Sequence, residues 1–234
     1  MGTAYWFYSN NRSLFSFVPL CHAKCYQKKK KIINLKKLST YLFLIFFGFS
    51  APSFADDISD FEIEGISIGD SALEYISLEE IQKEIKENKS HYEHLKNPYE
   101  FGEVYLINKE FQNYDLMSFF VKTDNEKYKI SAIRGLIYYN DDIEGCINKK
   151  NEISNVLSNM FKDAKKKEEN FNHSIDPSGN SKVYGTYFKL KSGEEVSVDC
   201  IDFEETLRNK MNWSEGITVG ITTIEFDNWI RSKK

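Results

Sequence analysis

Alternating apolar and polar positions predict an antiparallel sheet built largely from hairpins. The predicted strands are residues 102–107, 116–123, 128–139, 183–190, 196–201 and 217–226. Alternation over four to eight residues is typical of a strand with one buried face. Short polar turns at 124–127 and 191–194 separate two pairs of these runs, so each pair is predicted to form a hairpin. Residues 128–139 carry apolar atoms on both faces, which predicts a strand in the interior of the sheet.

Apolar residues at spacings of three and four predict the helices. The longest helix is expected over residues 142–166, with Lys162 and Lys165–Lys167 placed at the negative end of its dipole. Residues 71–88 predict two short helices or one bent helix, and a further short helix is expected to end near Met211. Capping boxes are predicted for four pairs: Ser71 with Glu74, Ser77 with Glu80, Asp141 with Glu144, and Asp202 with Glu205.

These elements together predict the α+β class. Helices at the front and in the middle of the chain are each followed by antiparallel hairpins. We therefore expect an antiparallel sheet of hairpins with one long helix and two or three short ones, after an N-terminal signal segment.

The distribution of charge divides the 234 residues into two parts. Residues 1–55 contain eight basic residues and no acid, whereas residues 56–234 contain 23 basic and 35 acidic residues, a formal charge of −12. We expect an N-terminal extension and secretory signal over 1–55 and one mature domain over 56–234. A domain this acidic repels phosphate backbones, so nucleic acid is not an expected partner.

The end of the first part has the order of a secretory signal. Lysines at 28–31 and 36–37 precede the apolar run 41–49, and Ser53 and Ala55 place small residues where signal peptidase requires them. Cleavage is predicted between Ala55 and Asp56, which makes the protein periplasmic or secreted and brings it to the membrane only before cleavage. An uncleaved anchor is the alternative, although the apolar run is shorter than the roughly 20 residues of a membrane span.

Cys146 and Cys200 are the only cysteines of the predicted mature domain. Cys146 lies on the apolar side of the long predicted helix, and Cys200 alternates with Val196 and Val198 in a predicted strand. Exported domains commonly join such pairs, so a disulfide between Cys146 and Cys200 is predicted. The alternative is two buried free thiols that pack as small apolar groups.

Clusters that could carry chemistry are few. His91 and His94 have a spacing that can share a metal on one helical face, but a site needs a third ligand. Two acidic clusters could attract calcium, although neither has the spacing of a calcium loop; they are Asp56, Asp57 and Asp60, and Asp199, Asp202, Glu204 and Glu205. No metal site and no cofactor is therefore predicted.

Catalytic motifs are not recognisable in the sequence. There is no nucleophile elbow, phosphate-binding loop or dinucleotide fingerprint. Cys146 or Cys200 could form a nucleophile with His173, but a disulfide is the more common use of two cysteines in an exported domain. Trp213, Trp229 and the many tyrosines could line a ligand groove, and core packing explains them equally. We assign no catalytic residue.

The chain resembles a group of small uncharacterised exported proteins of AT-rich marine alphaproteobacteria (SAR11-type). The resemblance rests on residues 60–75, on 128–139 with Cys146, and on 187–193 with Cys200. At the level of fold the chain is also similar to envelope proteins of the BamE and SmpA type. That similarity rests on Gly69-Asp70-Ser71, a turn that opens paired helices before a meander, and the lipid-bearing cysteine of that type is missing.

Export, small size and the lack of catalytic motifs favour one expectation about function. We expect a non-catalytic envelope domain that binds another envelope protein or a small ligand. The alternative is a periplasmic hydrolase that uses carboxylates and lacks short motifs. A pocket with two convergent acids would favour the hydrolase.

Overall fold

The computed structural model of the protein describes residue 58 and residues 61–107, 109–174 and 176–232. One seven-stranded sheet organises these residues, in the order β3-β4-β5-β9-β8-β7-β6, with antiparallel pairing throughout. Its strands are β3 (Phe101–Tyr105), β4 (Leu116–Lys122), β5 (Ile130–Tyr138), β6 (Lys165–Asn172), β7 (Lys182–Lys189), β8 (Glu195–Asp202) and β9 (Gly216–Thr222). A separate two-stranded hairpin is formed by β1 (Glu62–Ile63) and β2 (Ile66–Ser67).

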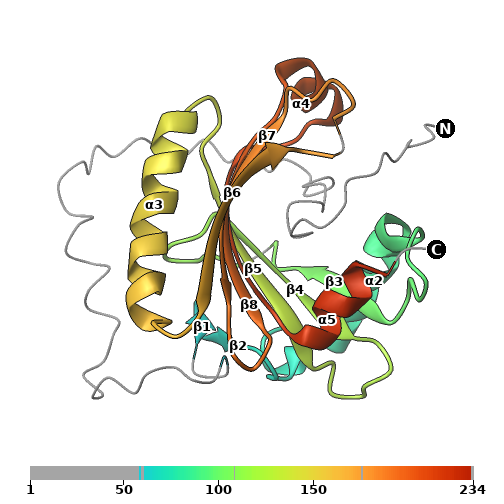
Figure 1. Cartoon of the computed structure of the whole chain (residues 1–234). Helices are drawn as coiled ribbons and strands as arrows, with labels where there is room; N and C mark the ends of the chain where they lie inside the picture. The colour runs from blue at the N-terminus through green and yellow to red at the C-terminus, as the bar shows by residue number, and fades with distance from the viewer. Residues whose placement is uncertain (1–57, 59–60, 108, 175, 233–234) are drawn as a thin grey trace.

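Helices lie on both sides of this sheet (Figure 1). The helical elements are η3 (Ala72–Glu74), α2 (Leu78–Asn88), η4 (Lys89–Tyr92), α3 (Ile143–Met160), α4 (Glu205–Met211) and α5 (Ile224–Ile230). α3 covers one face, whereas α4 and α5 lie on the other side at opposite ends of the sheet (Figure 1). We call these two faces the α3 face and the α5 face. The α+β class predicted from the sequence is confirmed.

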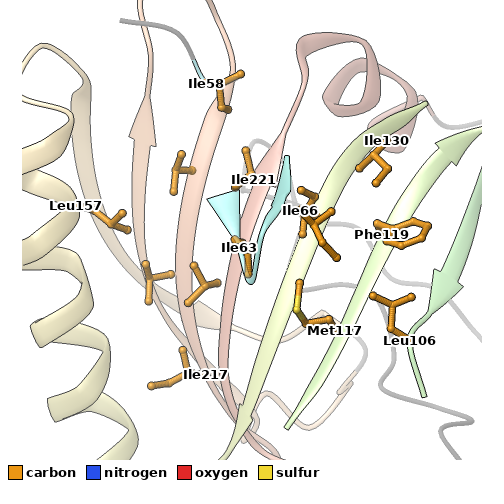
Figure 2. Packing of buried hydrophobic residues seen from close by; sticks show 14 of the residues in the cluster. Ile58, Ile63, Ile66, Leu106, Met117, Phe119, Ile130, Leu157, Ile217 and Ile221 are labelled. Atoms are coloured by element: carbon orange, nitrogen blue, oxygen red, sulfur yellow. The ribbon is translucent and has the colours of Figure 1, made fainter. Parts of the chain in front are cut away.

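The main hydrophobic core lies on the α3 face. Strands β4, β5, β8 and β9 contribute alternate apolar residues, which the β1–β2 hairpin and α3 cover. Figure 2 shows Ile63 and Ile66 of the hairpin over the sheet, with Leu157 of α3 on one side and Phe119 of β4 on the other. These four side chains are at most 3% exposed. Burial of this many apolar side chains is the main source of the domain's stability.

A covalent link between α3 and the sheet lies in the same core. Cys146 of α3 and Cys200 of β8 are joined as a disulfide, with Cα atoms 6.0 Å apart, inside the usual range. Both residues are at most 1% exposed. Cys200 shares the face of Val196 and Val198, as its alternation predicts, so the helix and the strand bring the two sulfurs together.

The long helix is shorter than predicted. It begins after Asp142, whose carboxylate accepts a hydrogen bond from Gly145 N at 2.9 Å, so the predicted pair of Asp141 and Glu144 does not form its cap. Asp141 instead pairs with Arg208. The helix ends at Met160, and Lys165–Lys167 begin the edge strand β6. A run of charged side chains, Lys165–Lys167 followed by Glu168 and Glu169, suits an exposed edge strand because it opposes pairing with another chain.

The other predicted helix starts have mixed outcomes. Ser77 and Glu80 form the predicted capping box of α2. Ser71 makes no cap and donates its hydroxyl to Lys127 O, and Glu204 rather than Asp202 caps α4. The predicted last strand stops at Thr222, where Thr223 caps the unpredicted helix α5.

None of the helices in the described part of the chain has the length and apolar character that crossing a membrane requires.

Candidate functional site

Polar and small residues gather in the middle of the α5 face. On β8, Ser197 and Asp199 point away from the α3 face because they alternate with Val196, Val198 and Cys200. Ser197 pairs with Gly220 of β9, and Asp199 pairs with Thr218 of the same strand. The α5 end of this face is packed by Phe226 and Trp229, and the α4 end by Phe203 and Trp213. The serine and the aspartate lie between these two apolar clusters along the sheet.

Asp199 is a buried carboxyl with incomplete hydrogen bonding. Its side chain is 0% exposed, and its Oδ1 accepts a hydrogen bond from the Tyr187 hydroxyl at 2.5 Å. Its Oδ2 and the buried Ser197 Oγ make no hydrogen bond of normal geometry, although Ser197 lies near enough to Asp199 to lower the pKa of the carboxyl. Buried polar atoms are nearly always hydrogen-bonded in native proteins, so two such oxygens on one strand face are unusual.

The lack of a side chain at Gly185 makes room for the Tyr187 hydroxyl. A Cβ atom at Gly185 would lie 2.1 Å from the Tyr187 hydroxyl, so this position must lack a side chain for the hydroxyl to reach Asp199. On the other side of Ser197, the pairing residue Gly220 also adds no side chain to the face. The two glycines leave Ser197, Asp199, Thr218 and the Tyr187 hydroxyl as the polar groups of this part of the sheet.

Burial, aided by the nearby charge of Glu195, raises the pKa of Asp199 to about 7, and the hydrogen bonds with Tyr187 and Ser197 oppose the rise. An acid with a raised pKa stabilises the folded state below its unfolded pKa, and this contribution is lost as the pH rises through the folded pKa. We expect the stability of the wild type relative to Asp199→Asn to fall by about 2 kcal/mol from pH 5 to pH 8. Urea denaturation of both proteins at each pH measures this difference in the free energy of unfolding. A difference independent of pH would contradict the raised pKa.

A second buried polar group lies on the same face, nearer the β3 edge. Arg134 forms an ion pair with Glu103, and both are at most 2% exposed. Arg134 also donates to Ser118 Oγ at 3.1 and 3.2 Å and to the Tyr105 hydroxyl at 3.4 Å, and Tyr92 donates to Glu103 Oε2 at 2.8 Å. We call these five residues the arginine cluster.

Charges within the arginine cluster balance each other. Burial alone would raise the pKa of Glu103, but Arg134, His91 and the Tyr92 hydrogen bond hold the pKa below its ordinary value. Burial likewise opposes the charge of Arg134, and Glu103 raises the pKa of that guanidinium. Both groups are therefore charged and neutralise each other, so the cluster leaves no spare charge for a ligand.

Glu103 and Asp199 do not form a catalytic carboxylate pair. Their strands, β3 and β8, are separated by β4, β5 and β9, which corresponds to about 19 Å at the usual strand spacing. The carboxyl groups of glycosidases lie about 5–10 Å apart.

Two pockets lie away from the middle of the α5 face. The first, of about 390 Å³, is next to α2 and β3 and is lined by residues including Lys86, Lys89 and Tyr99; we call it the α2 pocket. The second, of about 280 Å³, is lined by residues including Cys146, Asp202 and Glu215; we call it the disulfide pocket.

The disulfide pocket is lined by four acids, Asp141, Asp202, Glu205 and Glu215, and two of them, Asp141 and Glu215, are paired with Arg208. Glu215 accepts hydrogen bonds from Phe203 N at 2.8 Å and from Arg208 at 2.5 Å. Burial and the charge of Glu215 raise the pKa of Asp202. Glu215 thus ties the start of β9 to the β8–α4 connection, which is a structural role.

The candidate metal ligands do not converge. His91 Nδ1 lies 3.8 Å from Glu103 Oε2, and no group of three potential ligands occurs among the described residues. Asp199 and Asp202 lie on opposite faces of β8, and Glu204 caps α4. The cluster Asp56, Asp57 and Asp60 and the cleavage site between Ala55 and Asp56 lie outside the described residues.

The remaining candidates take structural positions. His173 packs its ring against Phe203 at 5.1 Å, while both candidate cysteine nucleophiles are in the disulfide. Trp213 and Trp229 lie in different apolar clusters and therefore do not line one groove.

Asp199 was considered in the sequence only as part of an acidic cluster. The alternation of Ser197 and Asp199 with Val196, Val198 and Cys200 was the signal that places it on the other face of the strand. The arginine cluster had no such signal, because Glu103 and Arg134 are 31 positions apart and their strands are not neighbours.

No protein-family model matches this chain, and neither does any curated protein or solved structure.

Proposed function

We propose that the protein is an exported, non-catalytic domain that binds a small ligand in the middle of the α5 face. The observation that carries this proposal is the pair of buried oxygens, Asp199 Oδ2 and Ser197 Oγ, which make no hydrogen bond of normal geometry. A bound molecule that donates hydrogen bonds would satisfy both, and satisfying them recovers the free energy that their burial costs. Binding sites commonly combine an apolar surround with a few such polar groups.

Ligand binding is preferred over carboxylate hydrolysis for two reasons. Glu103 and Asp199 are too far apart to act on one bond. Two of the four acids that line the disulfide pocket are already held: Asp141 by Arg208, and Glu215 by Arg208 and a backbone amide. Export remains part of the proposal and is supported by the order of charged, apolar and small residues up to Ala55.

Native mass spectrometry of protein released from the periplasm of a secreting host tests the proposal. After incubation with a periplasmic extract, we expect a retained mass that disappears on denaturation. Ser197→Leu, which adds bulk in the middle of the α5 face, should abolish the retained mass. Ser192→Leu makes the same change at an exposed turn and should preserve it.

Two results would contradict binding at this face. One is the absence of any retained mass in the wild type, and the other is equal retention by the Ser197→Leu and Ser192→Leu proteins. Amino-terminal sequencing of the same preparation tests the export part separately, because cleavage after Ala55 gives a chain that begins with Asp56.

A further inference from the structure

The hydrogen-bonding groups around Asp199 define what a ligand must supply. Asp199 Oδ2 and Ser197 Oγ, on the same side of β8, make no hydrogen bond of normal geometry, although Ser197 lies near enough to lower the pKa of Asp199. Residues two apart on a strand are separated by about 6.8 Å, so one small molecule can reach both. A carboxylate only accepts hydrogen bonds, so a ligand that binds Asp199 must carry hydrogen-bond donors.

The charge of the α5 face is the second constraint on the ligand. Arg134, Lys167 and Lys189 lie on this face, and each has a carboxylate partner: Glu103, Glu169 and Asp227, respectively. Lys165 is exposed on the edge strand β6, two strands away from β8. Among the described residues, no lysine or arginine forms an ion pair with Asp199.

Lys150, which reaches the sheet from the α3 side, does not neutralise the charge of Asp199. Lys150 of α3 lowers the pKa of Asp199 only weakly, and its Nζ bonds to Thr186 Oγ1 at 3.1 Å. Glu195, two residues before Ser197 on the α5 face, adds negative charge. The middle of the α5 face therefore lacks a counter-charge for Asp199.

We infer that the ligand bound at Asp199 carries a cationic nitrogen with N–H donors, such as a primary ammonium group. This inference rests on the proposed function and names the class of ligand. An ammonium supplies both the missing hydrogen bonds and the missing positive charge, and charge-assisted hydrogen bonds are about twice as strong as neutral ones. A hydroxyl would supply donors without the charge, and a carboxylate would be repelled.

Three four-carbon probes test the inference on protein purified from the periplasm of a secreting host. Putrescine, 1,4-butanediol and succinate have the same length and end in ammonium, hydroxyl and carboxylate groups. By titration calorimetry at pH 8, where the carboxylate form of Asp199 predominates, putrescine should bind at least tenfold more tightly than the diol. Succinate should show no binding.

Two asparagine variants locate the binding site. Asp199→Asn should weaken putrescine binding at least tenfold. Asp202→Asn, the same change on the opposite face of β8, should alter it less than twofold. Urea denaturation of each variant verifies that it is folded, and an unfolded Asp199→Asn protein would be replaced by Ser197→Ala, for which a weaker but measurable loss is expected.

Several outcomes would overturn the inference. They are equal or tighter binding of the diol or of succinate, unchanged putrescine binding by Asp199→Asn, and no binding of any probe. Failure of the proposed function is recognised separately, by retention of the same mass in the Ser197→Leu and Ser192→Leu proteins. A ligand that is retained by the wild type, is lost from Ser197→Leu and proves to be neutral or anionic would overturn only the ammonium assignment.

Discussion

Replacement of Arg134 by methionine should lower the free energy of unfolding by about 3–5 kcal/mol. The substitution leaves the Glu103 carboxylate buried without its counter-ion, and an uncompensated buried charge is strongly destabilising. It also removes the donor to Ser118 and Tyr105. Urea denaturation at pH 7 measures the loss.

Two controls separate the buried charge from a general effect of substitution. Lys122→Met removes a cation from the Lys122–Glu225 pair, which is partly exposed, and should cost less than about 1 kcal/mol. The double variant Glu103→Gln/Arg134→Met removes both charges and should be more stable than Arg134→Met alone. Equal losses for the Lys122 and Arg134 variants would show that the arginine cluster is not the stabilising unit described here.

Loss of the disulfide is the second large effect that we expect. Replacing Cys146 and Cys200 together with alanine should lower the free energy of unfolding by about 2–4 kcal/mol. The bond closes a loop between positions 54 apart and ties α3 to the sheet, so its removal frees the unfolded chain. Urea denaturation with and without reducing agent measures the effect.

Reduction is the matched control for this prediction. A reducing agent should destabilise the wild type and leave the double-alanine variant unchanged. Mass spectrometry should find the oxidised protein two hydrogens lighter than its reduced form. Alkylation of both thiols in unfolded protein that has not been reduced would show that the bond is absent and would remove the basis of the prediction.

Local patterns in the sequence predicted much of the fold because they reflect local geometry. The hairpin β4–β5, the hairpin β7–β8 and the capping box at Ser77 follow from alternation, turn residues and the chemistry of a helix start. The position of Cys200 on the buried side of its strand followed from the same alternation. These features depend on residues close together in the chain.

The errors arose where two structures share one local pattern. Lys165–Lys167 suit the end of a helix as well as a charged edge strand, and the pairing of β6 with β7 decides between them. Ile224 and Phe226 extend the apolar run of β9, so the pattern predicts more strand where a helix starts after Thr223. Tertiary pairing and a capping hydroxyl resolve these cases, and neither is visible from apolar spacing alone.

The candidate site was less predictable than the fold. Asp199 and Asp202 are close in sequence, but the pleat of β8 places them on opposite faces. The contact of Tyr187 with Asp199 depends on the register of β7 and β8 and on a glycine at position 185. Only the assembled sheet brings these groups together.

The most direct test of ligand binding at the α5 face is to locate a bound probe by NMR. With putrescine added to isotopically labelled protein from the periplasm of a secreting host, the amide signals of Ser197, Asp199 and Gly220 should shift the most. Amides that line the α2 pocket, such as Gly102 and Thr123, should shift little. Shifts confined to the α2 pocket or to the disulfide pocket would contradict binding at Asp199 and place the ligand site elsewhere.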